Sequence, residues 1–165
     1  MSAKEFKLTV VTPDKSFFKD VSAMAVGAIG TEGAFTALPG HVPFLTDLKP
    51  GPVWYRDLEG VVDTIFVGGG FVEVLPEKVT ILADSAEKLD EIDRDRAEKA
   101  ILKAQERLAA AKRQPQVDIP ANLSPEEEAR LRRERIDVAI EEAALQKALA
   151  RVRTAREKSK IPHKH

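Results

Sequence analysis

The sequence divides into two parts of different composition, and this break is its strongest constraint on the fold. All nine glycines and all seven phenylalanines lie in the stretch that ends at Phe71. After Ser85 the chain consists mainly of Ala, Glu, Arg, Lys and Leu. Glycine, aromatic residues and short alternating runs are typical of β-structure, whereas the second composition is typical of long helices. We therefore expect an α+β chain with two domains, 1–86 and 87–165.

The first part contains short apolar runs separated by turn residues, a spacing typical of a β-sandwich. The expected strands cover Phe6–Val10, Val21–Ile29, Val53–Leu58, Val61–Val67, Phe71–Leu75 and Val79–Leu82. Four prolines, Pro39, Pro43, Pro50 and Pro52, follow the second of these runs. Proline cannot donate to a strand ladder and is avoided inside central strands, so residues 39–52 are predicted to form a structured loop.

The second part predicts a first helix that begins after Asp93 and ends near Arg113. The Asp93 carboxylate is placed to accept hydrogen bonds from the N–H groups of the first turn. Apolar residues then recur at three- and four-residue steps, which puts them on one helix face. These residues are Ala97, Ile101, Ala104, Leu108 and Ala111.

A second helix is predicted from the Ser-Pro-Glu-Glu segment at 124–127 to about Lys158. This segment matches a capping box. The serine is the cap, the proline takes the first helical position, and a glutamate stands three residues after the serine. Its apolar stripe comprises Leu131, Val138, Leu145, Leu149 and Val152. Prolines interrupt the helical pattern in a link at about 114–125. The expected arrangement is a two-helix antiparallel hairpin.

This hairpin is expected to be weakly held, because its apolar faces consist largely of alanine. Burial stabilises by ~0.8 kcal/mol per CH₂, so exchanging several leucines for alanine forfeits several kcal/mol of interface. Helices of this kind can separate from a neighbour and stay helical, which is a physical basis for a switch. The alternative is a hairpin with a purely structural role.

Several classes of function are disfavoured by the composition. The chain has no cysteine, which excludes disulfides, thiolate catalysis and Cys-ligated metals. Its formal net charge of −1 gives no overall basic signal for nucleic acid. His41 is the only histidine outside the C-terminal tail, and no nucleophile elbow, zinc motif or phosphate loop occurs. No catalytic or metal-ligating residue is therefore predicted, and neither a signal peptide nor a membrane span is expected.

The glycine- and proline-rich segment Gly30–Gly51 adds a family resemblance. Its core from Leu38, Leu-Pro-Gly-His-x-Pro-x-Leu-Thr-x-Leu-Lys-Pro-Gly, resembles the signature loop of the epsilon subunit of F-type ATP synthase. Gly69–Val74 and Val79–Asp84 extend the similarity, and Ile92–Ala97 resembles the nucleotide motif of that family. The region from about 114 to 135, which is rich in Pro, Glu and Arg, is longer than the usual short link of the family.

The resemblance implies a non-catalytic rotor subunit of the central stalk, which couples the catalytic head to the proton-driven c ring. The sandwich would bind the gamma subunit and the c ring. The rotor-contact residues it implies are Glu32, Gly33, Leu38, Pro39, Gly40 and His41. Glu32 has the alternative of an ordinary exposed carboxylate. The expected location is peripheral, on the cytoplasmic face of the bacterial inner membrane, with no nucleic-acid partner.

The resemblance also implies that the C-terminal helices inhibit ATP hydrolysis by extending into the catalytic head, where their basic end would meet acidic segments. A solvated basic tail is the alternative. No cofactor is required, but ATP is a candidate regulatory ligand. Its implied binding residues are Glu87, Asp93, Arg96, Lys103, Lys147 and Arg151. The structural alternative is that Asp93 only caps the helix and Arg96 pairs with Glu87 or Asp95.

A second class of function stays open at this level. The chain has the features of a free-standing binding module, in which a sandwich and a helical hairpin sense nucleotide or dock an unrelated partner. The proline-rich loop favours the rotor subunit, because a free sensor has no need of such a contact loop.

Overall fold

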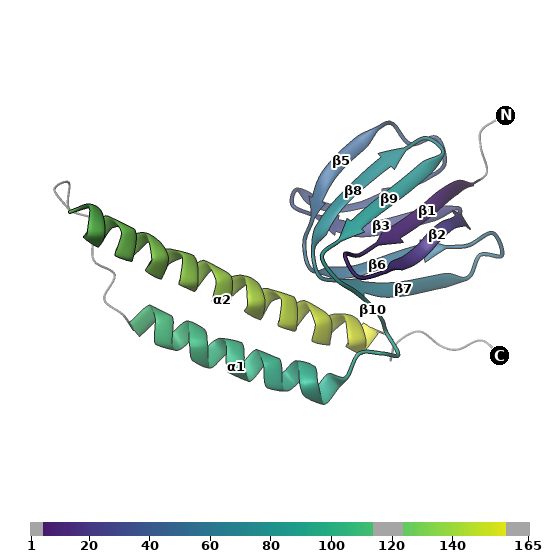
Figure 1. The fold of residues 1–165 in the computed structure, drawn as a ribbon. Coiled ribbons are helices and arrows are strands. Elements are labelled where there is room, and N and C mark those ends of the chain that lie inside the picture. The colour runs from purple at the N-terminus through teal and green to yellow at the C-terminus, as the bar shows by residue number, and fades with distance from the viewer. Residues whose placement is uncertain (1–4, 114–123, 158–165) are drawn as a thin grey trace. The chain divides into compact units, whose positions relative to one another are not determined.

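The computed structural model describes residues 5–113 and 124–157. The chain falls into two compact units. One runs to Ile92 and takes in the chain from Ala150 on, whereas the other spans Asp93–Leu149. The first unit contains the strands and the second contains most of both helices (Figure 1). The last turns of the second helix therefore belong to the strand-containing unit.

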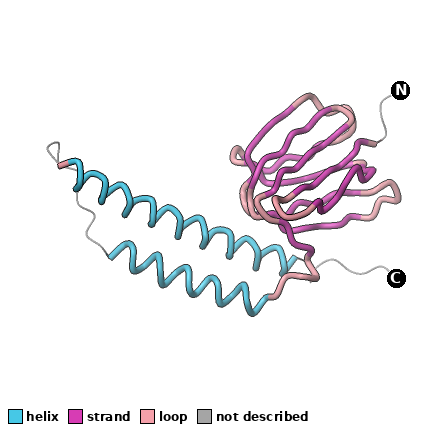
Figure 2. The backbone as a smooth tube through the Cα atoms, in the orientation of Figure 1, coloured by secondary structure: helices cyan, strands magenta, loops and turns pink. Residues whose placement is uncertain are grey.

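Within the described residues, ten strands form one hydrogen-bonded sheet that folds over into two layers (Figures 1 and 2). The strands are β1 (Phe6–Val11), β2 (Ser16–Ala23), β3 (Ala25–Gly30), β4 (Gly33–Ala37), β5 (Phe44–Leu48), β6 (Gly51–Arg56), β7 (Val62–Val67), β8 (Gly70–Leu75), β9 (Lys78–Ala83) and β10 (Ala86–Lys88). Their order is β10-β7-β6-β3-β5-β8-β9-β1-β2, with β4 added on β3. The β1–β9 pair is parallel, and the other pairs are antiparallel.

The core lies between the two layers and is filled by alternate side chains of the strands. β8 shows the period of two clearly, because Val72 and Val74 are buried and their neighbours Phe71 and Glu73 are exposed. β1, β3, β7 and β9 contribute most of the remaining core, and β2, β4, β5 and β6 contribute one residue each. This arrangement confirms the predicted sandwich and gives a rigid, close-packed platform.

The predicted strand Val21–Ile29 was wrong, because two strands cover this segment. β2 pairs with β1, whereas β3 pairs with β4 and β6, so the chain changes partners between them. Met24 stands at the break, where its N–H donates to the Arg56 carbonyl over 2.8 Å. A continuous apolar run hides such a change of layer, since both strands contribute to the same core.

The predicted loop 39–52 was also wrong in its second half. β5 forms within it and pairs along its whole length with β8, and β6 begins at Gly51 and includes Pro52. Pro52 is tolerated inside this interior strand because β3 pairs with β6 only from Trp54 to Arg56. Pro52 stands opposite Phe66 of β7 and outside the pairing with β3, so no bond to β3 is lost there.

The first helix, α1 (Arg94–Arg113), begins where the sequence predicted. The Arg96 N–H donates to Asp93 Oδ1 over 3.0 Å, which confirms Asp93 as the cap. Ala97 and Ala104 are buried, and the other residues of the predicted face are half-buried. Asp95 adds negative charge to the first turn, where it interacts favourably with the positive end of the helix dipole.

The second helix, α2 (Pro125–Glu157), begins with the predicted capping box. The Glu127 N–H donates to Ser124 Oγ over 3.3 Å, and the Ser124 N–H donates back to Glu127 Oε2 over 3.0 Å. Most of the predicted link, the last residue of the predicted helix and the Leu131 side chain lie outside what the structure describes. Val138 and Leu145 are half-buried, Val152 is buried, and Leu149 lies at the exposed edge of the stripe.

The two helices run in opposite directions side by side, as expected for a hairpin (Figure 2). Within the second unit they are joined by ion pairs from Arg107 to Glu141 over 3.7 Å and from Lys112 to Glu142 over 2.8 Å. Arg107, Lys112 and Glu142 are more than half exposed, and ion pairs with a well-solvated member contribute little to stability. In the described part of the chain, neither helix has the length and apolar character needed to cross a membrane.

Candidate functional site

The predicted contact loop Leu38–His41 connects β4 to β5 and is anchored to the turn between β8 and β9. The Gly40 N–H donates to the Pro76 carbonyl over 2.8 Å, and the His41 N–H donates to the Leu38 carbonyl over 3.0 Å. Gly40 has a φ of 81°, which favours glycine, and Leu38 is exposed. The loop therefore presents an apolar side chain from a fixed backbone.

The other two predicted rotor-contact residues, Glu32 and Gly33, lie at the opposite end of β4. Glu32 is exposed in the turn after β3, and Gly33 opens β4 with a φ of 133°. This turn is held to the sheet by the Lys49 ammonium, which donates to the Thr31 carbonyl over 3.0 Å. Four residue steps along a strand cover about 13 Å, so the predicted contacts form two separate points that flank β4.

An apolar row on the outer face of the sheet was missed by the sequence analysis. Register places Phe71 of β8 beside Leu82 of β9, and Leu45 of β5 beside Glu73, so all three apolar side chains point away from the core. Phe71 is 54% exposed, Leu82 is 56% exposed and Leu45 is 72% exposed. We call Leu45, Phe71 and Leu82 the outer row. Its signal in the sequence is a strand with apolar residues in both phases, Gly-Phe-Val-Glu-Val-Leu.

A separate aromatic cluster lies near the contact loop on the other face of the sheet, because Phe44 stands opposite the buried Val74 and so faces away from the outer row. The Phe44 ring at the start of β5 lies 6.3 Å from the His41 ring and 5.4 Å from the Phe35 ring, between centroids. The His41 Nδ1 atom lies 2.7 Å from the Val42 carbonyl oxygen. Since monomeric proteins expose few contiguous apolar patches, the outer row has the character of a protein-binding surface.

The predicted nucleotide-binding residues are divided between the two units. Glu87 on β10 and Arg151 on α2 lie together in the strand-containing unit, where the guanidinium Nη2 donates to Glu87 Oε1. This pair is partly buried. Glu87 is thus paired with Arg151, whereas the structural alternative gave Arg96 either Glu87 or Asp95 as its partner.

The remaining four predicted nucleotide-binding residues, Asp93, Arg96, Lys103 and Lys147, belong to the second unit. The Asp93 carboxylate is used by the helix cap, whereas Arg96 and Lys103 are exposed and Lys147 is half-buried. Lys147 lies one helical turn before Arg151, so the two share a face of α2. No group of three potential metal ligands occurs in the described ranges.

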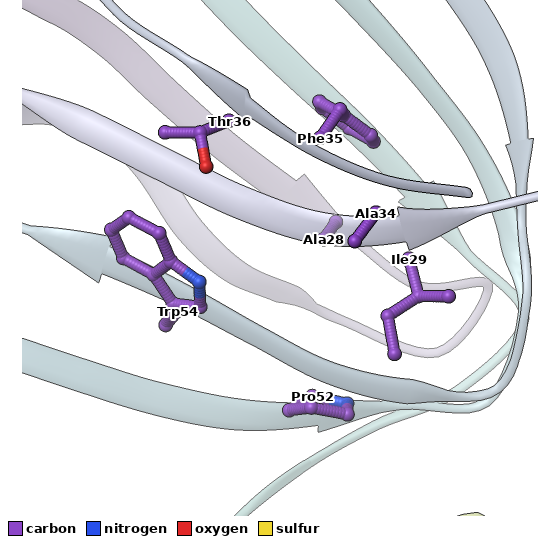
Figure 3. A pocket seen from close by; sticks show the side chains of 7 residues that line it. All are labelled: Ala28, Ile29, Ala34, Phe35, Thr36, Pro52 and Trp54. Carbon is purple, nitrogen blue, oxygen red and sulfur yellow. The ribbon is translucent and has the colours of Figure 1, made fainter.

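A shallow depression of about 220 Å³ lies on β3, β4 and β6 (Figure 3). It is lined by Ala28, Ile29, Ala34, Phe35, Thr36, Pro52 and Trp54. The Trp54 ring covers Gly27, where an added Cβ would lie 2.3 Å from ring atoms. Thr36 is its only side chain with a hydroxyl, and no lining side chain is titratable. The depression therefore has no groups suited to acid–base or nucleophilic chemistry.

Comparison with known proteins identifies the family. The beta-sandwich domain of the ATP synthase delta/epsilon chain matches residues 5–89. The ATP synthase epsilon chain of Nitratidesulfovibrio vulgaris (strain DP4) is 42% identical over 150 residues, which cover 91% of this chain and 95% of that one. The epsilon chain of Syntrophobacter fumaroxidans is 37% identical over 153 residues, covering 93% and 97%.

A solved structure shows the same fold at lower sequence similarity. A chain in the mitochondrial ATP synthase of Euglena gracilis, solved as OSCP/F1/c-ring in rotational state 1, matches with a TM-score of 0.68 and 22% identity. The match covers 96% of this chain and 83% of that one. The fold class and the family resemblance predicted from sequence are both confirmed. This chain belongs to the epsilon-chain family of ATP synthases, a family of non-catalytic subunits.

Proposed function

We propose that the strand-containing unit is the platform by which this subunit binds the gamma subunit and the c ring, and so couples the catalytic head to the proton-driven ring. The outer row carries this proposal. Three exposed apolar side chains on a close-packed sheet are stabilised when a partner covers them. We assign this surface to gamma, because a shaft protein needs a broad, rigid apolar contact.

The c ring is assigned to the opposite end of β4. Glu32 and Gly33 form a tight polar turn there, about 13 Å along the strand from the contact loop. An exposed carboxylate on a fixed backbone suits contact with the polar loops of a membrane ring. Docking to the ring would put the subunit, as a peripheral component, at the cytoplasmic face of the bacterial inner membrane.

Binding to gamma is tested by replacing Phe71 of the outer row with aspartate. A charge at the centre of an apolar interface has to be desolvated, so we expect at least a tenfold loss of affinity for purified gamma, measured by co-purification and by calorimetry. Leu58→Asp is the matched control, because Leu58 is 53% exposed in the turn between β6 and β7. Equal effects of the two substitutions, or none for Phe71→Asp, would refute the assignment.

The helices are proposed to inhibit ATP hydrolysis by extending into the catalytic head. α2 has 33 residues, so it is about 50 Å long at ~1.5 Å per residue. The buried side chains of α1 are both alanines, Ala97 and Ala104, and each ion pair between the helices has at least one exposed member. This composition suits an element that leaves its partner and remains helical.

Truncation after Ala111 removes α2 and is expected to raise ATP hydrolysis by the assembled complex. Deletion of residues 158–165 alone is the matched control, since it removes the basic tail and retains the helix. Unchanged hydrolysis after the longer truncation would defeat the inhibitory role. An equal rise from both truncations would assign inhibition to the tail.

ATP is proposed as a regulatory ligand held by Glu87, Asp93, Arg96, Lys103, Lys147 and Arg151. The side-by-side position of Glu87 and Arg151 supports a site there, and Lys147 is on the same face of α2. Lysine lacks the forked geometry of arginine, so a weak site is expected. Titration calorimetry of the isolated chain tests the proposal, and an absence of heat at millimolar ATP would end it.

A further inference from the structure

The last two turns of α2 are held to the strands by a small contact. Phe66 of β7, Ile92 and Ala155 form a buried cluster, and Leu89 and Ala150 pack against it half-buried. Apart from Phe66 and Ile92, this cluster is built from small or half-exposed side chains. Thr154, which is also buried, uses its hydroxyl internally and donates to the Ala150 carbonyl over 2.9 Å. Apolar packing here is therefore limited.

Arg151 adds a polar contact at the same place and bridges two strands. Its guanidinium pairs with Glu87 on β10, and its central carbon lies 5.3 Å from the centroid of the Phe66 ring on β7. Glu87 and Phe66 are directly opposite one another in the β10–β7 register. One side chain of α2 thus makes a charge-assisted hydrogen bond and a cation–π contact on adjacent strands.

The environment of this pair strengthens it relative to an ordinary surface ion pair. The Arg151 and Glu87 side chains are 26% and 30% exposed, whereas the interhelical Lys112–Glu142 pair is 52% and 51% exposed. The Arg151 Nε atom is buried and finds no acceptor among the described residues. Screening by water and salt is weaker for partly buried charges. Loss of either partner would leave the other desolvated and unpaired, which carries a further cost.

We propose that the Glu87–Arg151 pair is a latch that keeps the C-terminal turns of α2 on strands β7 and β10 without any bound nucleotide. Release breaks the pair and exposes the Phe66 ring, so the latch sets how often these turns detach. Phosphate groups compete with Glu87 for the guanidinium, which makes the latch sensitive to phosphate-bearing ligands. Its regulatory meaning rests on the proposed inhibitory function, whereas its existence is a property of this chain alone.

Hydrogen exchange of the full chain, without nucleotide or partner subunits, tests the latch. We expect Arg151→Gln and Glu87→Gln each to speed exchange of amides in Ala150–Glu157 about tenfold, which corresponds to ~1.4 kcal/mol. Amides of β8 should keep their protection. Lys112→Gln is the matched control, because it removes an exposed ion pair, and it should leave exchange of these turns within twofold of the unmodified chain.

A charge-reversed pair provides a second test of the latch in the same hydrogen-exchange experiment. The double variant Glu87→Arg with Arg151→Glu should regain most of the protection that either single substitution loses. Unchanged exchange in Arg151→Gln would overturn the latch, as would equal loosening of β8 and the terminal turns, or a failure of the reversed pair to restore protection. The readout involves no partner, so gamma binding and the latch can fail independently.

Discussion

Gly70, at the start of β8, is the position where a single added methyl group should be least tolerated. It has a φ of 125°, and a Cβ added there would lie 2.1 Å from the Leu82 carbonyl oxygen and 2.9 Å from the Ala83 Cα atom. Both obstacles are backbone atoms of the paired strand β9, so they cannot rotate away. Gly70→Ala combines ~1–3 kcal/mol of backbone strain with ~1–3 kcal/mol of overpacking. We expect a total loss of about 2–6 kcal/mol in the free energy of unfolding.

Gly33→Ala separates these two contributions. Gly33 has a similar φ of 133°, but no atom lies within 4 Å of the place that an added methyl group would take, so only the strain of ~1–3 kcal/mol applies. Urea unfolding of the isolated chain, followed by the fluorescence of the single tryptophan Trp54 in β6, measures both variants. Equal destabilisation by the two substitutions would refute the argument from the backbone clash.

Three further predictions concern the buried cluster around Phe66 and the caps of the two helices. Phe66→Ala should lower the free energy of unfolding by ~3–5 kcal/mol because the ring is fully buried, whereas the exposed Phe71→Ala should change it by ~0.5 kcal/mol or less in urea unfolding. Asp93→Ala removes the cap of α1 and should cost ~1 kcal/mol in thermal unfolding followed by circular dichroism, and Asp93→Asn should retain most of it. Hydrogen bonds from the hydroxyl and then the N–H of Ser124 lower the pKa of Glu127. Stability from this carboxylate is therefore present above the ordinary glutamate pKa and lost as the pH falls through the lower folded value. Helicity measured against pH should show this loss, and Ser124→Ala should flatten it.

The strand errors have one physical cause, which is that pairing partners are remote. The run Val21–Ile29 is apolar throughout most of its length, and only its pairing with β1 on one side and β6 on the other divides it at Met24. Pro52 is acceptable in β6 because β3 pairs with β6 only from Trp54 onward, two residues after the proline. Neither fact can be read from local propensity, because propensity describes a strand without its neighbours.

The proposed binding residues also differ in whether local sequence or remote strand pairing reveals them. The contact loop follows from a contiguous motif, and the structure shows how its backbone is anchored. The outer row depends on which strands adjoin β8, because Phe71 and Leu82 become neighbours only through the β8–β9 register. The apolar residues in both phases of β8 were a signal in the sequence, but their exposure is a tertiary property.

Composition, caps and a contiguous motif were enough to establish a β-sandwich followed by helices, both helix starts and the family. These features are local: Asp93 and Ser124 satisfy N–H groups within three residues of themselves. The tertiary structure alone decided the change of layer at Met24, the outer row and the pairing of Glu87 with Arg151 across 64 residues. Those contacts depend on how remote segments pack, and packing is a property of the whole folded chain.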